Sequence, residues 1–357
     1  MSQELNQLFS PYILGNIELK NRVVMAPMTR SRAIGNLPNE LVVKYYAERT
    51  GAGLLITEGT SPSPNGLGYS RIPGIFSDAQ VAAWKKVTDA VHTNGGNIFM
   101  QLMHTGRVSH PLNMSEGTEI IAPSAIAPPK TPMWTDQQQM QPIPAPRELT
   151  TEEVEAVINE FVHSAENAIK AGFDGIEIHA ANGYLPMQFL NTGSNKRTDK
   201  YGGSIENRNR FVLELTTAIA AAIGKEKTGV RLSPFGTYND MENDESTEEQ
   251  YKALVKGLNE IDPVYLHLVS FAIPPAVLDE LVTLFDGAIM LNGGYTAEKA
   301  ETDIGSGKTD LVSFGGLFIS NPDLVERFKN GVELATPDNT TFFSADEKGY
   351  TDYPFAK

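Results

Sequence analysis

Short apolar segments alternate with longer amphipathic segments along most of the chain. Each short segment is a nearly continuous apolar run, which is the pattern of parallel strands that are buried on both faces. A run bounded by turn residues can be assigned to a strand by its short length and its β-branched content. The predicted strands are Val23–Met28, Leu54–Glu58, Asn97–Met103, Gly175–His179, Gly229–Ser233, Val264–Val269, Ala288–Leu291 and Leu311–Phe314.

Helix start signals stand between these strands. The segments that follow them carry apolar residues at i, i+3 and i+4 spacing, and glycines such as Gly172 and Gly224 end two of them. A strand followed by a helix, repeated eight times, predicts a (β/α)8 barrel rather than a doubly wound sheet. The start signals are Asp78, Thr150 or Thr151, Ser204, Thr296 and the pair Asn321-Pro322.

Three segments interrupt this alternation. Residues 104–150 carry eight prolines and follow the third strand, so we expect a cap over an active site at that strand's carboxyl end. The stretch Tyr238–Glu249 is strongly acidic and is expected to be a solvated loop. Residues 1–22 precede the first strand and can plug the bottom of the barrel. The whole chain, 1–357, is expected to form a single domain, since barrels of this length usually do.

Composition narrows the functional classes. The net charge of −15 disfavours nucleic-acid and membrane partners, because an acidic surface repels phosphates and anionic lipids. The chain has no cysteine, which excludes disulfides, thiolate catalysis and cysteine-based metal sites. The first twelve residues lack the features of a signal peptide, and no run of about 18 apolar residues occurs. A cytoplasmic protein is therefore expected.

The residues at the ends of the predicted strands exclude several reactions. No strand ends in a lysine that could form a Schiff base, and the six histidines lack the spacing of a metal site. A Gly-x-Ser-x-Gly elbow and paired carboxylates are also absent. The hydrogen-bonding groups that remain suit a protein that binds a cofactor and relies on its chemistry. They are Thr29, Gln101, His179, Asn182, Tyr184 and Arg231.

Two glycine pairs, Gly293-Gly294 and Gly315-Gly316, end strands seven and eight. Barrel enzymes frequently bind phosphate at this position through backbone N–H groups, although turns also require glycine. His179 alone could equally be a buried structural histidine. Asn182 and Tyr184 follow it on the same loop, and three polar groups at one barrel mouth favour a functional site.

Longer motifs identify a family. In chain order they are Phe9–Tyr12 with Leu19–Arg30, His179–Leu185, Asn195–Asp199 with Tyr201–Ser204 and Glu206–Arg208, and Phe318–Leu324. The likeness runs over almost the whole chain. The motifs resemble the Old Yellow Enzyme family of FMN-dependent ene-reductases and NADH:flavin oxidoreductases, including the N-ethylmaleimide reductase-like members.

The resemblance implies non-covalent FMN and a ping-pong reaction. NADPH or NADH reduces FMN and leaves, and an alkene conjugated to a carbonyl or nitro group then receives the hydride from flavin N5. It further implies that His179 and Asn182 hydrogen-bond the activating oxygen of this substrate, where negative charge develops. Tyr184 would protonate the α-carbon as general acid.

The same resemblance assigns residues to the cofactor. It places Thr29 on flavin O4, Gln101 on the pyrimidine edge, and Arg231 near N1 and O2, where a positive charge favours the reduced ring. The further residues that it implies are Pro27, Met28 and Gly59 beside the ring, Gly293, Gly294, Gly315 and Gly316 at the phosphate, and Tyr69, Met103 and Tyr350 in the substrate pocket.

Three positions depart from the family pattern or vary within it. Gly316 stands where many members carry an arginine on the FMN phosphate, and losing that contact should cost ~1.5–3 kcal/mol of binding if nothing compensates. Met103 stands where related nitroester reductases often have tryptophan, so the pocket is expected to be reshaped. Asn182 replaces the second histidine of some members.

Two alternatives stay open at this stage. The first is a flavin enzyme that mainly reduces nitro compounds or nitrate esters, and the second is a barrel that has lost FMN and serves another purpose. The sequence does not choose between NADPH and NADH or between monomer and homodimer, and it does not reveal the physiological substrate.

Overall fold

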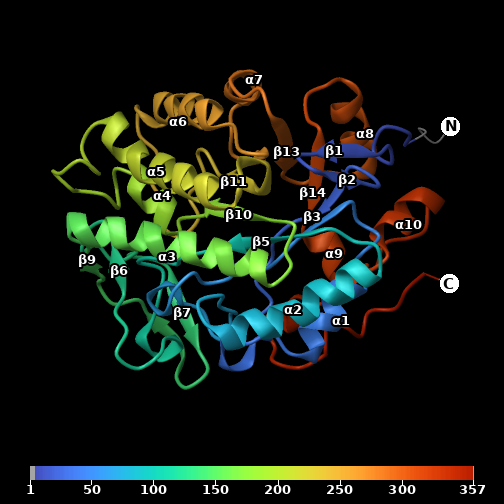
Figure 1. Cartoon of the computed structure of the whole chain (residues 1–357), viewed down its shortest axis with the longest axis horizontal. Coiled ribbons are helices and arrows are strands. Elements are labelled where there is room, and N and C mark those ends of the chain that lie inside the picture. Colours follow the sequence, from blue (N-terminus) through green and yellow to red (C-terminus); the bar gives the residue numbers. More distant parts are fainter. Residues whose placement is uncertain (1–4, 357) are drawn as a thin grey trace.

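A closed barrel of eight parallel strands forms the centre of the molecule, as the computed structural model shows for residues 5–356 (Figure 1). Its strands pair in the order β10-β11-β12-β13-β14-β3-β4-β5. All eight predicted strands are confirmed, with ends that differ by a few residues. They are β3 (Val23–Met25), β4 (Leu54–Ile56), β5 (Ile98–Leu102), β10 (Gly175–Ala180), β11 (Thr228–Leu232), β12 (Tyr265–Val269), β13 (Ala288–Asn292) and β14 (Leu311–Phe314).

Helices follow the strands and surround the barrel (Figure 1). The start signal Thr150 is confirmed as a capping box with Glu153, which satisfies free N–H groups of the first turn. Helix α2 begins at the predicted Asp78, but its capping box is formed by the preceding Ser77 with Gln80. The helices are α1 (Glu40–Ala47), α2 (Asp78–Thr93), α3 (Thr151–Lys170), α4 (Leu185–Leu190), α5 (Ile205–Ile223), α6 (Thr247–Ile261), α7 (Pro275–Thr283), α8 (Ala297–Gly305), α9 (Gly316–Ser320) and α10 (Leu324–Asn330).

An N-terminal hairpin closes the bottom of the barrel. Strands β1 (Tyr12–Leu14) and β2 (Ile17–Leu19) pair antiparallel, and Leu14 and Leu19 pack into a buried cluster of barrel residues from several strands. Gly15 makes the turn with φ 55°, and a Cβ there would lie 2.5 Å from the Glu226 carbonyl oxygen. The plug expected from residues 1–22 is confirmed for this hairpin, while residues 1–4 lie outside the described part.

The segment 104–150 folds against the opposite end of the barrel (Figure 1). Its main feature is an antiparallel hairpin, β7 (Pro132–Thr135) with β8 (Gln139–Pro142), that borders the cavity described below. The short strands β6 (Ile121–Ala122) and β9 (Arg147–Glu148) pair with each other and bring the two ends of the segment together. The expected capping insertion is thus present.

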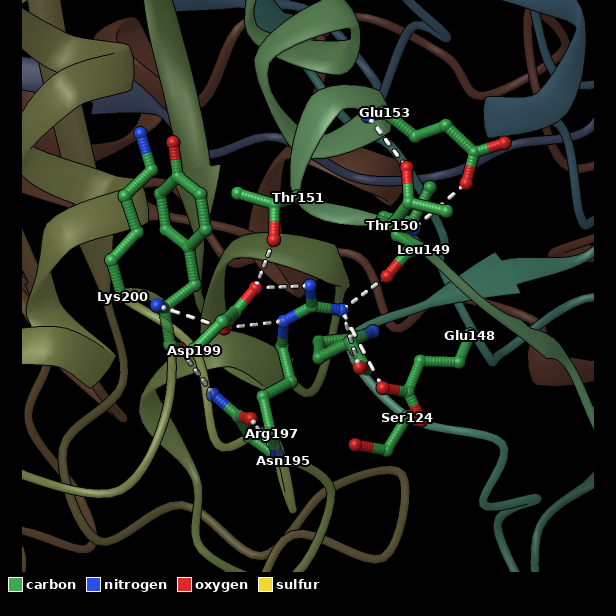
Figure 2. A network of polar contacts seen from close by, with 12 residues as sticks. Ser124, Glu148, Leu149, Thr150, Thr151, Glu153, Asn195, Arg197, Asp199 and Lys200 are labelled. Atoms are coloured by element: carbon green, nitrogen blue, oxygen red, sulfur yellow. Dashed lines mark hydrogen bonds and ion pairs between the residues drawn. The ribbon is translucent and has the colours of Figure 1, made fainter.

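Arg197 fastens two parts of this cap to the loop that follows α4 (Figure 2). Its guanidinium donates to the Pro123 carbonyl at 3.1 Å and to the Leu149 carbonyl, and it forms a two-point ion pair with Asp199. Asp199 in turn accepts from the Thr151 hydroxyl at 2.6 Å. One buried cation therefore holds the cap near its middle and at its C-terminal end.

The acidic stretch Tyr238–Glu249 differs from the solvated loop expected from its composition. Asn239 and Met241 are buried, and the Asp240 carboxylate accepts from the backbone N–H groups of Lys130 and Thr131 in the cap. Helix α6 already begins at Thr247. The expectation holds for Glu242, Asp244 and Glu245, which are exposed, and it fails for Asp240, whose carboxylate accepts from backbone donors instead of only facing water.

We predict that Arg197→Ala loosens the cap. Hydrogen bonds to a charged group contribute about 1.5–3 kcal/mol, so residues 104–150 should be cleaved faster in limited proteolysis and the urea midpoint should fall. Lys200→Ala is the matched control, since it removes only an exposed ion pair with Glu155. Equal cleavage rates in both variants would contradict the anchoring role of Arg197.

Candidate active site

A cavity of about 1040 Å³ opens at the carboxyl ends of the barrel strands. Its size suits a large cofactor together with a small molecule. Three parts of the chain surround it: strand ends, the β7–β8 hairpin of the cap, and the C-terminal segment 340–345. The predicted site residues that line it are Pro27, Met28, Thr29, Tyr69, Gln101, Met103, His179, Asn182, Tyr184, Arg231 and Gly316.

The other predicted glycines lie beside the cavity without lining it. Gly59 supports Met103, because a Cβ on Gly59 would lie 2.4 Å from the Met103 sulfur. Gly315 precedes α9 and lies against Met28. Gly293 and Gly294 follow the neighbouring strand β13 with φ values of 148° and 66°, which favour glycine.

The structure does not bring Tyr350 to the cavity, so its prediction as a pocket residue is corrected. Tyr350 is fully buried and stacks on Tyr45 with ring centroids 4.1 Å apart. The Arg30 and Arg32 guanidiniums lie over its ring, at 5.3 and 4.7 Å from the centroid. Its aromatic ring serves packing and cation–π contacts, which the sequence could not distinguish from substrate contact.

The end of β10 presents His179 to the cavity, and the loop that follows it presents Asn182 and Tyr184. Asn182 has φ 55°, a left-handed conformation that asparagine tolerates, and its backbone N–H donates to the Ser233 hydroxyl at 2.8 Å. The Asn239 amide donates to the Asn182 carbonyl at 2.8 Å. Two hydrogen bonds from outside the loop thus hold this turn.

Burial keeps the two ring side chains of this loop neutral. It lowers the pKa of His179 well below the usual value, and the Arg231 charge adds to this effect. Burial also raises the pKa of Tyr184 well above its ordinary value, with a further contribution from Tyr69. The Tyr184 hydroxyl lies 3.1 Å from the Tyr69 hydroxyl. His179 is therefore a neutral imidazole at neutral pH, and Tyr184 retains its proton.

Gln101 and Arg231 line the inner side of the cavity, above a buried polar group that the sequence analysis missed. The Gln101 amide donates to Glu177 at 2.8 Å, and Glu177 also contacts His267 at 2.7 Å. Glu177 precedes His179 by two residues on the same strand, so both side chains point into the barrel. A charged residue in the middle of an otherwise apolar strand was the available signal.

Two buried polar atoms beside the cavity have no hydrogen-bond partner in the described part of the chain: Arg231 Nε and His179 Nδ1. Buried polar groups are normally paired, so unpaired ones beside a cavity indicate a bound partner with complementary groups. The N1 and O2 acceptors of a flavin ring fit the Arg231 donor, and an acceptor on a second small molecule in the same cavity fits His179. Fold and site together define a barrel oxidoreductase with a flavin site.

Comparison with known proteins supports the assignment as a barrel oxidoreductase with a flavin site. Residues 7–335 match the model of the NADH:flavin oxidoreductase / NADH oxidase family, and the chain belongs to this family. It is 40% identical to a probable flavin mononucleotide-dependent alkene reductase of Leishmania infantum, over 99% of both chains. The structure superposes on morphinone reductase in complex with tetrahydroNAD with a TM-score of 0.94 and 43% identity, over 98% of both chains.

A second solved structure, the old yellow enzyme homologue from Zymomonas mobilis, gives a TM-score of 0.93 and 40% identity, over 98% of this chain and 99% of that one. The resemblance drawn from the motifs is thereby confirmed. Confirmed with it are the barrel fold, the oxidoreductase class and the cofactors, FMN with a nicotinamide hydride donor. Within residues 5–356, no helix is long and apolar enough to cross a membrane.

Glu58 is a second buried carboxylate near the cavity, directly after β4. One of its oxygens accepts from the Arg30 backbone N–H at 3.2 Å, and the other has no partner among the described residues. Burial raises its pKa to about 7, against the opposing effect of Arg30 and Arg32. The folded protein therefore holds a proton on Glu58 that the unfolded chain, with a pKa of 4.5, releases.

We predict a pH dependence of stability from Glu58. Because its folded pKa is raised, its contribution is fully present below pH 4.5 and is lost as pH rises through about 7. The free energy of unfolding should fall by about 3 kcal/mol over this pH range, and Glu58→Gln should abolish this pH dependence. Urea unfolding of the FMN-saturated protein between pH 5 and 8 measures the slope. The exposed Glu249→Gln is the control, and identical slopes in all three proteins would refute the assignment.

Proposed function

We propose that this protein reduces alkenes activated by a conjugated carbonyl or nitro group. The proposal rests on two groups of polar side chains that line the same cavity. His179, Asn182 and Tyr184 supply two oxygen-binding groups and a proton donor, while Gln101 and Arg231 line the same cavity from within the barrel. The relative from Leishmania infantum, described as an alkene reductase, supports the same substrate class.

When bound beside Gln101 and Arg231, FMN would supply hydride chemistry, with NADH or NADPH as the donor. His179 and Asn182 bind the carbonyl or nitro oxygen and stabilise the negative charge that grows there as the β-carbon accepts the hydride. A neutral His179 donates one hydrogen bond to this oxygen. Tyr184 delivers a proton to the α-carbon, and its raised pKa keeps that proton in place until the carbanion forms.

The remaining predicted residues hold the cofactor in this proposal. Thr29 and Gln101 hydrogen-bond the polar edge of the ring, Arg231 favours the negative charge of the reduced ring, and Pro27 and Met28 pack against it. Gly59 makes room for Met103, and the glycines after β13 and β14 leave backbone N–H groups for the phosphate. Tyr69 and Met103 then shape the substrate end, and residues 1–357 act as one FMN-binding domain.

Three expectations from the sequence are retained as predictions. They are a cytoplasmic location, a monomer or homodimer, and small-molecule enones or nitro compounds as substrates. Nitrate-ester reduction is the competing activity, and parallel turnover of cyclohexenone and a nitrate ester by the holoenzyme distinguishes the two. Turnover of the nitrate ester alone would refute the alkene proposal.

We predict that Tyr184→Phe separates the two half-reactions. General acid catalysis contributes roughly 10²–10⁴-fold, so oxidation of the reduced enzyme by cyclohexenone should slow by at least the lower figure. Reduction of the bound FMN by NADH should change little, because it needs no proton from Tyr184. Stopped-flow absorbance measures both rates, with Tyr251→Phe on α6, outside the cavity, as control. Equal losses in both half-reactions would show that Tyr184 is not the proton donor.

We predict that Gly316→Arg tightens FMN binding. Gly316 lines the cavity, and a Cβ there meets no atom within 4 Å, so a side chain can leave the backbone at this position without a clash. A charge-assisted contact of about 1.5–3 kcal/mol corresponds to a roughly 10- to 100-fold lower Kd. Fluorescence titration of the apoprotein measures it. Riboflavin, which lacks the phosphate, is the control ligand, and an equal gain for riboflavin would contradict a phosphate contact.

A further inference from the structure

A layer of polar side chains lies inside the barrel between the apolar plug and the cavity. Below it, the hairpin residues Leu14 and Leu19 pack with inward-facing apolar residues such as Phe99 and Met290. Above it lie the cavity residues. The layer consists of Gln101, Glu177, His267 and Ser313, joined by the hydroxyl of Tyr265.

Glu177 is the centre of this layer and is fully buried. One carboxylate oxygen accepts from the Gln101 amide at 2.8 Å. The other accepts from the Tyr265 hydroxyl at 3.1 Å and from His267 Nδ1 at 2.7 Å. A buried carboxylate with three protein donors is well satisfied, and none of these contacts belongs to the substrate-binding loop.

The contact with Glu177 fixes the orientation of Gln101. A carboxylate can only accept hydrogen bonds, so the Gln101 amide must turn its NH₂ group towards Glu177. The Gln101 carbonyl oxygen is then the acceptor available on the cavity side. Without Glu177, the two ends of this amide would be free to exchange places.

The layer carries one negative charge. His267 Nδ1 lies 2.7 Å from the Glu177 carboxylate, to which it donates, and Nε2 lies 2.8 Å from the Ser313 hydroxyl, a contact in which a neutral imidazole accepts. Burial lowers the pKa of His267 in spite of the nearby carboxylate. Burial alone would raise the pKa of Glu177, but His267, Arg231 and Gln101 hold it below the usual range. The carboxylate is therefore ionised.

Arg231 is the matching positive charge. Its guanidinium is buried and donates to the Asn292 side chain at 3.2 Å, and no ion pair to it is found within 4.0 Å among the described residues. Burial lowers the pKa of Arg231, and Glu177 is the carboxylate that opposes this effect. Arg231 pairs in register with His179 on the neighbouring strand β10, and Glu177 lies two residues before His179, so the two buried charges lie near each other without an ion pair and interact through a medium of low polarity.

We propose that Glu177 is a positioning residue of the flavin site, whose buried carboxylate orients the Gln101 amide and offsets part of the positive field of Arg231 at the cavity. This inference rests on the proposed function, in which Gln101 and Arg231 face the polar edge of FMN. Arg231 favours the reduced, anionic ring, and Glu177 limits that preference. The reduction potential of the bound flavin is then set by the pair and not by Arg231 alone.

The test is the reduction potential of the FMN-loaded protein. Glu177→Gln keeps the size of the side chain and removes its charge, so the field of Arg231 is no longer offset. We expect at least a tenfold shift of the equilibrium towards reduced FMN, which is about 30 mV for this two-electron couple. Dye-equilibrated spectrophotometric titration measures it.

Tyr265→Phe is the matched control, because it removes one hydrogen bond to the same carboxylate and leaves the charge in place. Its potential should stay near that of the unsubstituted protein. An unchanged potential in Glu177→Gln, or the same rise in Tyr265→Phe, would overturn the charge-compensating role.

A second arm does not depend on FMN. Removing one partner of a buried charge pair destabilises a protein more than removing both. If Glu177→Gln lowers the urea midpoint of the apoprotein or prevents folding, Glu177→Gln with Arg231→Gln should restore part of the loss. A double variant at least as unstable as the single one would overturn the pairing. Colourless protein that takes up no added FMN would refute the proposed function, and this arm would still decide the pairing.

Discussion

A carboxylate inside a closed barrel is tolerable only if the surrounding side chains replace the water it has lost. Glu177 meets this condition through three donors from two other strands, since Gln101 comes from β5 and Tyr265 and His267 come from β12. Breaking any of these contacts leaves a buried acceptor unpaired. The arrangement therefore fixes the inward side chains on either side of β10, and with them the inner surface on which the active site is built.

The site itself consists of segments that are far apart in the chain and held by buried cations. Arg197 fastens the cap, and Arg32 and Arg49 bind backbone carbonyls of the C-terminal part, such as Thr341 and Phe318. Arginine suits this purpose, because its planar group donates in several fixed directions at once. The barrel strands thus form the bottom of the cavity, and guanidinium contacts hold the segments that form its sides. These contacts explain how long loops form a defined pocket.

The sequence predicted the parts of this structure that depend on local pattern. All eight strands followed from apolar runs, and the starts of α2 and α3 followed from capping residues. Contacts between distant segments could not be predicted in this way. Tyr350 was assigned to the pocket although it packs on Tyr45, and the acidic stretch after β11 was assigned to solvent although Asp240 binds backbone donors of the cap. Glu177 was missed because its role depends on strand register, which brings it beside Gln101.

The two ends of the proposed FMN site differ in how they are built. At the ring end, Arg231 and Gln101 are positioned by a buried network that extends through Glu177 to Ser313. At the proposed phosphate end, Gly316 carries no side chain, and a Cβ there would meet no atom within 4 Å. In this proposal, the charged side chains that recognise the cofactor therefore lie beside the isoalloxazine ring, whose charge changes during the reaction. A contact there acts on both affinity and reduction potential, whereas a contact on the phosphate acts on affinity alone, because the phosphate keeps its charge through the cycle. A glycine instead of an arginine at position 316 can thus weaken FMN binding without changing the reduction potential, which Glu177 and Arg231 adjust.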